Sequence, residues 1–326
     1  MYGTAQPGPG ASHLNKQMRV HSAGGGGFTG VANLGAFVYR AAPEFWRRMS
    51  QDRRRTVRPA PYRPNPQAWS DRGLYAAWLG HTTVLLKIDG FTLITDPVFS
   101  TRIGIGLGPV TVGLKRLVAP ALVHAELPKI DLVLLSHAHM DHFDLPSLRR
   151  LQSRGTTVVT AARTADLLRC YRYAGIRELD WGEKTTVGPL EVRAFQVAHW
   201  GARMRNDTWR GYNGYTVEAG RYRVLFGGDT AATTAFRQLR TSRPFDLGIM
   251  PVGAYNPWIH AHCTPEQAWR MANDAGVETI LPVHHQTFAL SREPYLEPLE
   301  RLQTAAGRDA ARLAVQRIGQ EWRFVP

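Results

Sequence analysis

The sequence predicts an α/β fold in which β-sheets are covered by helices, and three observations lead to this prediction. Residues 130–136, IDLVLLS, form a continuous apolar run, which is typical of a strand covered on both faces. Strand-like runs alternate with helical patterns along most of the chain. Several of these strands end in loops rich in histidine or aspartate. Because strand ends gather at one edge of an α/β sheet, we expect a functional site at that edge.

The remaining elements follow in order along the chain. Residues 83–95 hold two apolar runs around Asp89-Gly90, a strong hairpin signal. After residues 130–136, a helix is expected from its cap at Asp144 to a stop at Gly155. Further strands are expected at 156–161, 190–200, 245–252 and 278–285, with a strand pair at 214–229, and further helices at 164–175, 264–276 and 297–306. The helix at 264–276 has the sequence of a capping box, with Thr264 as N-cap and Gln267 at N3.

The 326 residues are enough for one large domain or two modest ones. We expect a flexible tail over residues 1–27, a basic lead segment with aromatic residues over 28–70, and a main domain over 71–326. The tail lacks the compact apolar core of a signal peptide. The aromatic residues of the lead segment either lie on an anionic membrane surface or pack on the main domain while its arginines face water. The prolines between Pro59 and Pro66 favour packing, because they interrupt any continuous helix.

The charge of the chain favours anionic partners. Forty Lys and Arg residues stand against 26 acidic ones, a net charge of +14. Nucleic acid, acidic lipid headgroups and phosphorylated substrates all fit this charge, and a well-solvated surface is the alternative. Cys170 and Cys263 are far apart and match no metal-ligand spacing, which indicates a reducing compartment. No apolar run approaches the roughly 20 residues that cross a bilayer. We therefore expect a cytoplasmic protein, with peripheral attachment at the inner membrane surface left open.

The motif HAHMDH, residues 137–142, follows the buried strand directly. His137 and His139 are two residues apart and project the same way from an extended turn. Asp141 continues this alternation, and His142 follows where the backbone bends into the helix. One short segment therefore supplies imidazoles and a carboxylate to two adjacent points, which suits zinc and similar metals. Solvated surface histidines are the alternative, but they would not explain the position after a buried strand.

Later strand ends supply the further ligands that a metal pair needs. His199 closes the run FQVAH, Asp229 closes VLFGGD, and His284 closes ILPVH. A single histidine at a strand end is more often structural than a metal ligand. Together with the HAHMDH cluster, these three residues point to a dinuclear metal site.

This pattern resembles the ligand set of the metallo-β-lactamase superfamily. The resemblance implies an αββα sandwich of two mixed β-sheets flanked by helices, with two divalent metal ions in a cleft at one edge. Zinc is expected, with Mn, Fe or Co as alternatives. The resemblance assigns His137, His139 and His199 to one ion and Asp141, His142 and His284 to the other, with Asp229 bridging both.

The chain is similar in particular to the branch of the N-acyl-phosphatidylethanolamine-hydrolysing phospholipase D and its bacterial relatives. This likeness covers about residues 74–302, and its motifs lie at residues 78–100, 127–144, 244–258 and 283–302. The lead segment and residues 201–217 match poorly, so substrate choice is expected to differ there. The resemblance implies a phosphodiesterase of phospholipase D type that uses a metal-bridging hydroxide on such lipids. A lactonase or other ester hydrolase is the alternative. A nucleic-acid-processing protein is disfavoured, because residues 134–283 leave no room for an inserted recognition domain.

The resemblance also suggests roles for residues around the metals. Asp141 is expected to hold a metal and steer the hydroxide, or to act as a ligand only. His262 is expected to donate to a phosphate oxygen or to protonate the leaving group, and a helix-flanking solvent histidine is the alternative. His81 and Asp96 are expected to fix the second nitrogens of the ligand imidazoles, with capping of the Asp96-Pro97 turn as the alternative for Asp96.

Other candidates lie near the same strand end. Neighbours on a strand face opposite ways, so only one of His284 and His285 can face the metals; we assign His284 and leave the exchange open. Residues expected to line the substrate cleft are Tyr255, Asn256, Trp258 and Phe288. Trp258 and Phe288, together with Trp200, would form an apolar wall for acyl chains, with core packing as the alternative.

Overall fold

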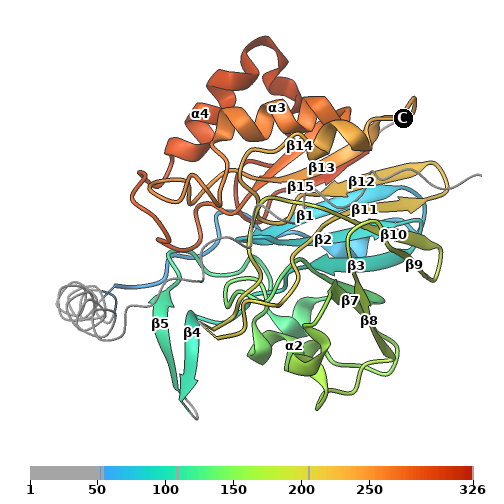
Figure 1. The fold of residues 1–326 in the computed structure, drawn as a ribbon, viewed down its shortest axis with the longest axis vertical. Helices are drawn as coiled ribbons and strands as arrows, with labels where there is room; N and C mark the ends of the chain where they lie inside the picture. The colour runs from blue at the N-terminus through green and yellow to red at the C-terminus, as the bar shows by residue number, and fades with distance from the viewer. Residues whose placement is uncertain (1–51, 53–54, 108–109, 205, 325–326) are drawn as a thin grey trace, which may run out of the picture. The chain divides into compact units, whose positions relative to one another are not determined.

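The computed structural model describes residue 52 and residues 55–107, 110–204 and 206–324. The fold described here is that of residues 55–324. Two mixed β-sheets lie against each other, with α3 (Pro265–Ala275) and α4 (Glu297–Ala306) outside one sheet and α2 (Leu145–Leu151) outside the other (Figure 1). The predicted αββα arrangement is confirmed.

Within the described residues, the first sheet has seven strands in the order β15-β1-β2-β3-β6-β7-β8, and the second has six in the order β14-β13-β12-β11-β10-β9. The strands of the first sheet are β1 (Leu74–Gly80), β2 (Thr83–Ile88), β3 (Phe91–Thr95), β6 (Leu132–Leu135), β7 (Thr157–Ala161), β8 (Gly175–Leu179) and β15 (Glu321–Arg323). Those of the second are β9 (Lys184–Val187), β10 (Leu190–Phe195), β11 (Gly214–Ala219), β12 (Tyr222–Phe226), β13 (Phe245–Pro251) and β14 (Val277–Val283). A separate hairpin of β4 (Arg102–Leu107) and β5 (Val110–Lys115) projects away from the two sheets (Figure 1).

The main core lies between the two sheets. Leu85 and Leu134 of the first sheet and Val224 of the second belong to one cluster of buried apolar side chains. Each side chain of this size contributes about 1.5–3 kcal/mol when it leaves water. β6 pairs in parallel with β3 on one side and β7 on the other, and all four of its residues are buried, as its continuous apolar run predicts.

Two local predictions are confirmed in detail. Asp89 and Gly90 both have positive φ, +45° and +85°, as a two-residue hairpin turn requires. In α3, the Thr264 hydroxyl accepts from the Gln267 N–H at 3.3 Å, and Gln267 Oε1 accepts from the Thr264 N–H at 2.9 Å. Gly276 then ends this helix in the left-handed conformation.

The helix predicted over residues 164–175 is wrong. Only a short 3₁₀ turn, Ala165–Leu168, forms, and Gly175 begins β8 instead of ending a helix. The hydroxyls of Tyr171 and Tyr173 donate to carbonyl groups of α2, at 3.2 and 2.6 Å. These contacts with a distant element hold the segment against α2, and local helix signals do not reveal them. The preceding helix also ends at Leu151, short of the predicted stop at Gly155.

Part of the predicted lead segment packs on the main fold. The Arg58 N–H donates to the Leu117 carbonyl at 3.0 Å, and the Trp69 ring stacks on Tyr75 at 5.6 Å. The tail over residues 1–27 and the lead's aromatic residues between 37 and 46 lie outside the described residues. No helix in the described part of the chain is both long enough and apolar enough to cross a membrane.

Candidate metal centre

The polar residues predicted at separate strand ends meet at one edge of the sandwich. The loop after β6 carries His137, His139, Asp141 and His142, and His284 follows β14. The loop after β10 supplies His199, and Asp229 follows β12. Their nitrogen and oxygen atoms form groups in which all atoms lie within 4.8 Å of one another: His137, His139 and His199; His81, Asp141, His142 and His284; His137, His142 and Asp229; His199, Asp229 and His262.

The first group consists of three converging imidazoles. His137 Nε2 lies 2.8 Å from His139 Nδ1, and His199 Nε2 lies 3.3 Å from that same atom. Ligand nitrogens at about 2.05 Å from a tetrahedral zinc ion are about 3.3 Å apart. The spacing of the three nitrogens therefore fits a single bound cation.

The second group combines carboxylates with imidazoles. The nitrogens His142 Nε2 and His284 Nε2 each lie 3.5 Å from Asp141 Oδ2. The same nitrogens lie 3.1 and 3.0 Å from Asp229 Oδ2. That oxygen is also 3.8 Å from His199 Nε2 in the first group. Asp229 thus lies between the two groups, where a carboxylate can contact two cations.

Buried polar atoms at the centre support this fit. Asp229 is 2% exposed, and its Oδ1 has no hydrogen-bond partner among the described residues. The buried His262 Nδ1 likewise has no hydrogen-bond partner among them. A buried polar atom without a partner costs about 1–3 kcal/mol. A cation held between these groups would remove that cost for the carboxylate oxygen.

The electrostatics of these residues show how carboxylates and imidazoles complement each other. Burial alone would raise the pKa of Asp229, but His142 and His284 hold it well below its usual range. Burial would lower the pKa of His142, but Asp229 and Asp141 raise it well above its ordinary value. At His137, burial and the neighbouring imidazoles together lower the pKa well below its usual value. His137 is therefore neutral, which is the form of an imidazole that binds a metal.

Two residues hold the ligands in place where the sequence predicts such contacts. Asp96 is fully buried and accepts from His142 Nδ1 at 2.7 Å and from the Ser136 N–H at 2.7 Å and hydroxyl at 2.5 Å. Ser136 Oγ lies 2.9 Å from His137 Nδ1 as well. His81 Nε2 lies 3.0 Å from Asp141 Oδ2, so His81 holds a carboxylate, whereas we expected it to fix the second nitrogen of a ligand imidazole.

Backbone strain is concentrated around the centre. Seven non-glycine residues in the described chain have positive φ; His81, Asp96 and His284 belong to this site, and Ala254 and Gln286 line the cavity beside His284. Residues other than glycine avoid this region, so such conformations persist only where the surrounding structure enforces them. Strained backbone of this kind is found preferentially at functional sites.

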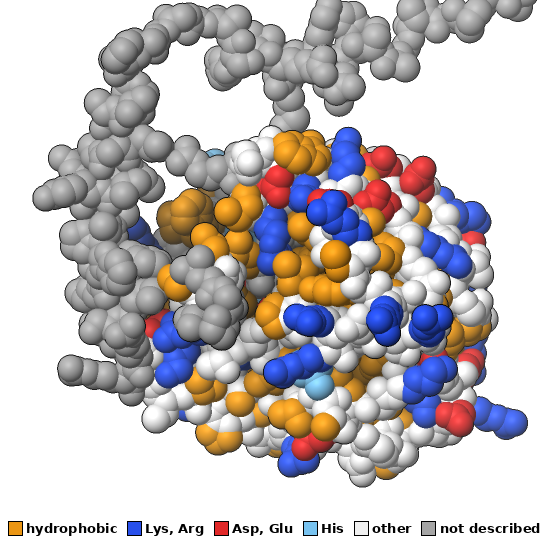
Figure 2. Space-filling view, turned by 90° about the horizontal axis from the view of Figure 1, so that it is seen from below, with side chains coloured by type: hydrophobic (Ala, Val, Ile, Leu, Met, Phe, Trp, Pro, Cys, Tyr) orange, Lys and Arg blue, Asp and Glu red, His pale blue; other side chains and the backbone are white. Residues whose placement is uncertain are grey.

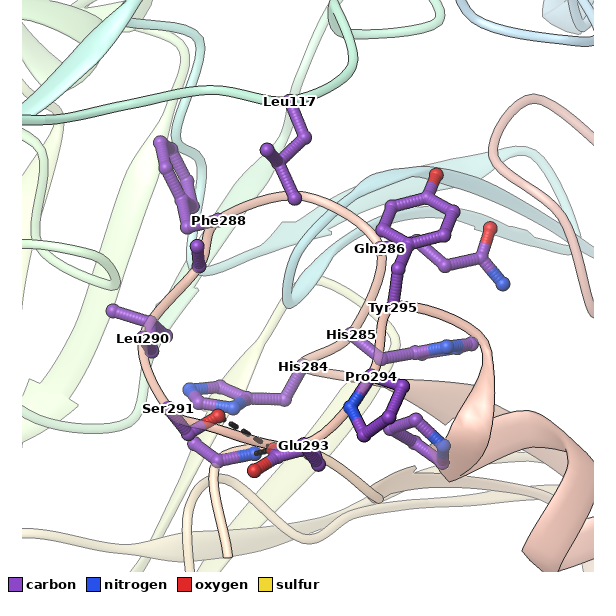
Figure 3. Close-up of a pocket in the computed structure, with 14 residues that line it drawn as sticks. Leu117, His284, His285, Gln286, Phe288, Leu290, Ser291, Glu293, Pro294 and Tyr295 are labelled. Carbon is purple, nitrogen blue, oxygen red and sulfur yellow. Dashed lines mark hydrogen bonds between the residues drawn. The ribbon is translucent and has the colours of Figure 1, made fainter. Parts of the chain in front are cut away.

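His284 and His285 point in opposite directions (Figure 3). His284 joins the cluster, whereas the ring of His285 stacks on Trp78 at 4.6 Å and lies in the hydrophobic interior. Both residues follow β14, which ends at Val283, and the positive φ of His284, +65°, accompanies this divergence where strand alternation no longer applies.

The predicted cleft residues differ in position. Phe288 is buried and its ring meets His81 edge-on at 5.2 Å, while Trp258 is exposed. The Tyr255 hydroxyl donates to Glu297 in α4 at 2.7 Å, and the Asn256 N–H donates to Glu293 at 3.2 Å. Neither Tyr255 nor Asn256 contacts the cluster within the described residues.

Arg203 is a site residue that the sequence does not reveal. Its Nη1 donates to the Ala138 carbonyl at 3.0 Å and to the Phe143 carbonyl at 2.8 Å. Ala138 lies between His137 and His139, and Phe143 follows His142, so one guanidinium bridges the beginning of the ligand loop and the residue after it. Arg203 lies in a segment without a recognisable motif, and only the folded chain brings it to this loop.

A cavity of about 110 Å³ opens beside His284. Its wall is mixed: Leu117, Phe288 and Leu290 line one side, and Gln286, Ser291 and Glu293 are among its polar lining residues (Figure 3). The Ser291 hydroxyl donates to Glu293 at 2.6 Å across the lower rim. The centre therefore combines a metal-binding cluster with adjacent space for an apolar group.

Comparison with known proteins places these features in a family. Residues 92–285 match a family model described as a beta-lactamase superfamily domain. An uncharacterized protein of Mycobacterium tuberculosis is 35% identical over 266 residues, covering 79% of this chain and 70% of the relative. The N-acyl-phosphatidylethanolamine-hydrolyzing phospholipase D 1 of Caenorhabditis elegans is 29% identical over 252 residues, covering 72% of this chain and 70% of that enzyme.

Solved structures share the fold. The isothiocyanate hydrolase from Delia radicum gut bacteria superimposes with a TM-score of 0.61 at 18% identity, covering 77% of this chain and 98% of that chain. A metallo hydrolase from Ignicoccus hospitalis gives a TM-score of 0.58 at 19% identity, covering 78% of this chain and 99% of the other. At these identities the likeness concerns the fold alone.

Proposed function

Because this chain belongs to the β-lactamase superfamily and is a metal-dependent hydrolase, we propose that it is a phosphodiesterase of phospholipase D type. Its proposed substrates are N-acyl-phosphatidylethanolamine-like lipids, cleaved between the phosphatidic acid and the N-acylated headgroup. The observation that carries this proposal is the match to the C. elegans enzyme, which spans 72% of this chain. The mitochondrial N-acyl-phosphatidylethanolamine-hydrolyzing phospholipase D of Saccharomyces cerevisiae is 28% identical over 248 residues, covering 72% of this chain and 52% of that enzyme.

The proposed metal ligands follow from the two side-chain groups. His137, His139 and His199 would hold one divalent cation. Asp141, His142 and His284 would hold the other, with Asp229 between them. A pair of zinc ions is proposed, and Mn, Fe and Co fit the same donors. When bound, such cations make a coordinated water strongly nucleophilic near neutral pH and polarise a phosphoryl oxygen.

The surrounding residues would orient the reacting groups. His81 holds Asp141 through the contact at 3.0 Å, which fixes the direction of that carboxylate. The ring of His262 lies 5.1 Å from His199 and 5.2 Å from His284, within reach of a group at the centre. We assign His262 to a phosphate oxygen or to the proton that the departing alkoxide oxygen needs.

The composition of the surface supports an anionic substrate at a lipid interface. Lys and Arg side chains lie among hydrophobic ones across the face seen in Figure 2. The net charge of +14 attracts anionic lipids and raises their local concentration. Phe288 and the cavity beside His284 add the apolar wall that an acyl-bearing substrate requires.

The direct test is release of N-acylethanolamine from vesicles that contain N-acyl-phosphatidylethanolamine. We expect release that depends on added metal and is lost in Asp229→Ala. His285→Gln serves as the matched control, since His285 faces away from the centre, and should retain release. Metal-loaded protein that turns over simple lactones but releases nothing from any glycerophospholipid would contradict the proposal and favour an ester hydrolase. Turnover of bis(nitrophenyl) phosphate would separate the phosphodiesterase from the lactonase.

A further inference from the structure

The β4–β5 hairpin has an unusual distribution of side chains. Its cross-strand pairs include Ile103 with Leu114, Ile105 with Val112, and Gly104 with Gly113. Residues opposite each other share a face, and residues two apart on a strand share it too. Ile103, Ile105, Val112 and Leu114 therefore form one aliphatic face. The opposite face, with Gly104, Gly106, Thr111 and Gly113, is almost bare backbone.

The bare face is built into the hairpin. A Cβ on Gly104 would lie 2.1 Å from the Val112 carbonyl oxygen, and one on Gly113 would lie 1.9 Å from that of Ile103. Both glycines also have positive φ, which disfavours a side chain. Side chains at these two positions would disturb the close strand pairing, so the hairpin keeps its apolar groups on one face only.

The aliphatic face leads from the metal centre to the surface. At the base, Ile103 and Leu114 pack with Phe288 and Leu290, which line the cavity beside His284. Phe288 in turn contacts His81 at 5.2 Å. Further along the hairpin, Phe288 and Leu290 no longer cover this face, and Ile105 is 50% exposed. The hairpin thus extends the apolar wall of the cavity outward into solvent.

The composition and length of the hairpin fit a lipid surface. No charged residue occurs between Arg102 and Lys115, which pair with each other across the base. Cations at the base match anionic headgroups, and aliphatic side chains beyond them match the acyl layer. Each strand has six residues, about 20 Å in length, so its outer half can reach the 5–10 Å depth of interfacial segments. Its open strand edges need headgroups or water as hydrogen-bond partners, which excludes deeper insertion.

We propose that the β4–β5 hairpin rests its aliphatic face in the acyl layer of an anionic lipid surface and leads an acyl chain toward the cavity beside His284. The role of the hairpin in guiding an acyl chain rests on the proposed lipid substrate. The test of lipid binding does not depend on that substrate, because vesicle binding is measured without catalysis.

The test compares two substitutions on adjacent residues of the hairpin. Ile105→Asp places a charge on the aliphatic face. Gly106→Asp adds the same charge on the bare face, where a Cβ meets no heavy atom within 4 Å. With vesicles of phosphatidylcholine and phosphatidylglycerol, we expect Ile105→Asp to weaken partitioning about tenfold or more and Gly106→Asp to weaken it much less. Far-UV circular dichroism and the urea midpoint of unfolding should match those of the unmodified protein in both variants, which shows that each is folded.

Equal loss in both variants, or no loss in either, overturns the proposal. If vesicles bind as proposed but no N-acylethanolamine is released, the docking inference stands and the proposed function fails. If Ile105→Asp and the unmodified protein hydrolyse the vesicle lipid equally well, the proposed function stands and the docking inference fails.

A fluorescent probe identifies the occupant directly. Ile105→Cys in a Cys170→Ser background carries an environment-sensitive label, since Cys170 is exposed and Cys263 is buried. Quenching by spin-labelled lipid after vesicle addition supports the proposal. A label already shielded without vesicles overturns it: shielding lost on dilution identifies a second copy of the chain, and shielding kept on dilution identifies the chain's own residues.

Discussion

The substitution Asp96→Asn tests how the centre fixes its imidazoles. Asp96 Oδ2 accepts from His142 Nδ1, so in the neutral imidazole that would bind a metal the other nitrogen, Nε2, carries the lone pair on the side of Asp141 and Asp229. The amide of asparagine has nearly the same shape but donates where the carboxylate oxygen accepts. The asparagine amide cannot flip, because the Ser136 N–H, which donates to Asp96 Oδ1 at 2.7 Å, needs an oxygen at that position. The substitution therefore favours the wrong tautomer of His142 and leaves the packing intact.

The expected magnitude follows from comparable sites. Loss of the group that orients a metal-bound histidine weakens metal affinity about 10–100-fold, or about 1.4–2.7 kcal/mol. The assay is an equilibrium competition for zinc against a chelator of known affinity, with urea unfolding of the metal-free protein in parallel. Asp144→Asn is the matched control, since Asp144 is also buried and accepts from Ser100 at 2.6 Å, away from the cluster. It should lower stability without a change in metal affinity. Unchanged affinity in Asp96→Asn, or equal losses in both variants, would refute this account of the site.

Three further predictions concern residues around and beyond the cluster. His284→Gln should lower the number of metal ions bound per chain, whereas His285→Gln should lower only stability, and metal analysis after dialysis decides between them. Arg203→Gln should leave the ligands in place but loosen their loop, so metal should dissociate faster in a stopped-flow chelator assay; an unchanged rate would contradict the proposed clamp. Arg301 donates to both oxygens of Glu266 at 2.8 Å and holds the pKa of Glu266 at about 2. Its contribution to stability is therefore present above the ordinary pKa of 4.5 and lost as pH falls toward 2. The Arg301 and Glu266 side chains are 36% and 42% exposed, so solvent weakens this ion pair. We expect Glu266→Gln to lower the free energy of unfolding by less than about 1 kcal/mol at pH 7 and by less still at pH 3. A loss of stability that is the same at both pH values in urea unfolding would contradict this account.

Local sequence signals predict the parts of this fold that depend on local interactions. The turn at Asp89-Gly90, the capping box at Thr264 and the ligand loop after β6 each involve residues within a few positions of one another. The failure at residues 164–175 has the opposite cause, because two tyrosine hydroxyls bind a helix about 25 residues earlier in the chain. The sequence does not predict the role of Arg203 for the same reason, since its hydrogen-bond partners lie 65 and 60 residues earlier in the chain.

The position of His284 shows why the site geometry needs the whole fold. Its φ of +65° turns the backbone just after β14, and no glycine marks this turn in the sequence. The neighbouring loop makes the conformation possible: a Cβ on Gly253 would lie 2.1 Å from the His284 carbonyl oxygen, so only glycine permits this approach. On the other side, the His284 N–H donates to the His81 carbonyl at 3.1 Å, and His81 itself has a φ of +54°. The direction of one imidazole therefore depends on two loops that are distant in sequence, and the strain they hold gives the cluster one arrangement before any cation binds.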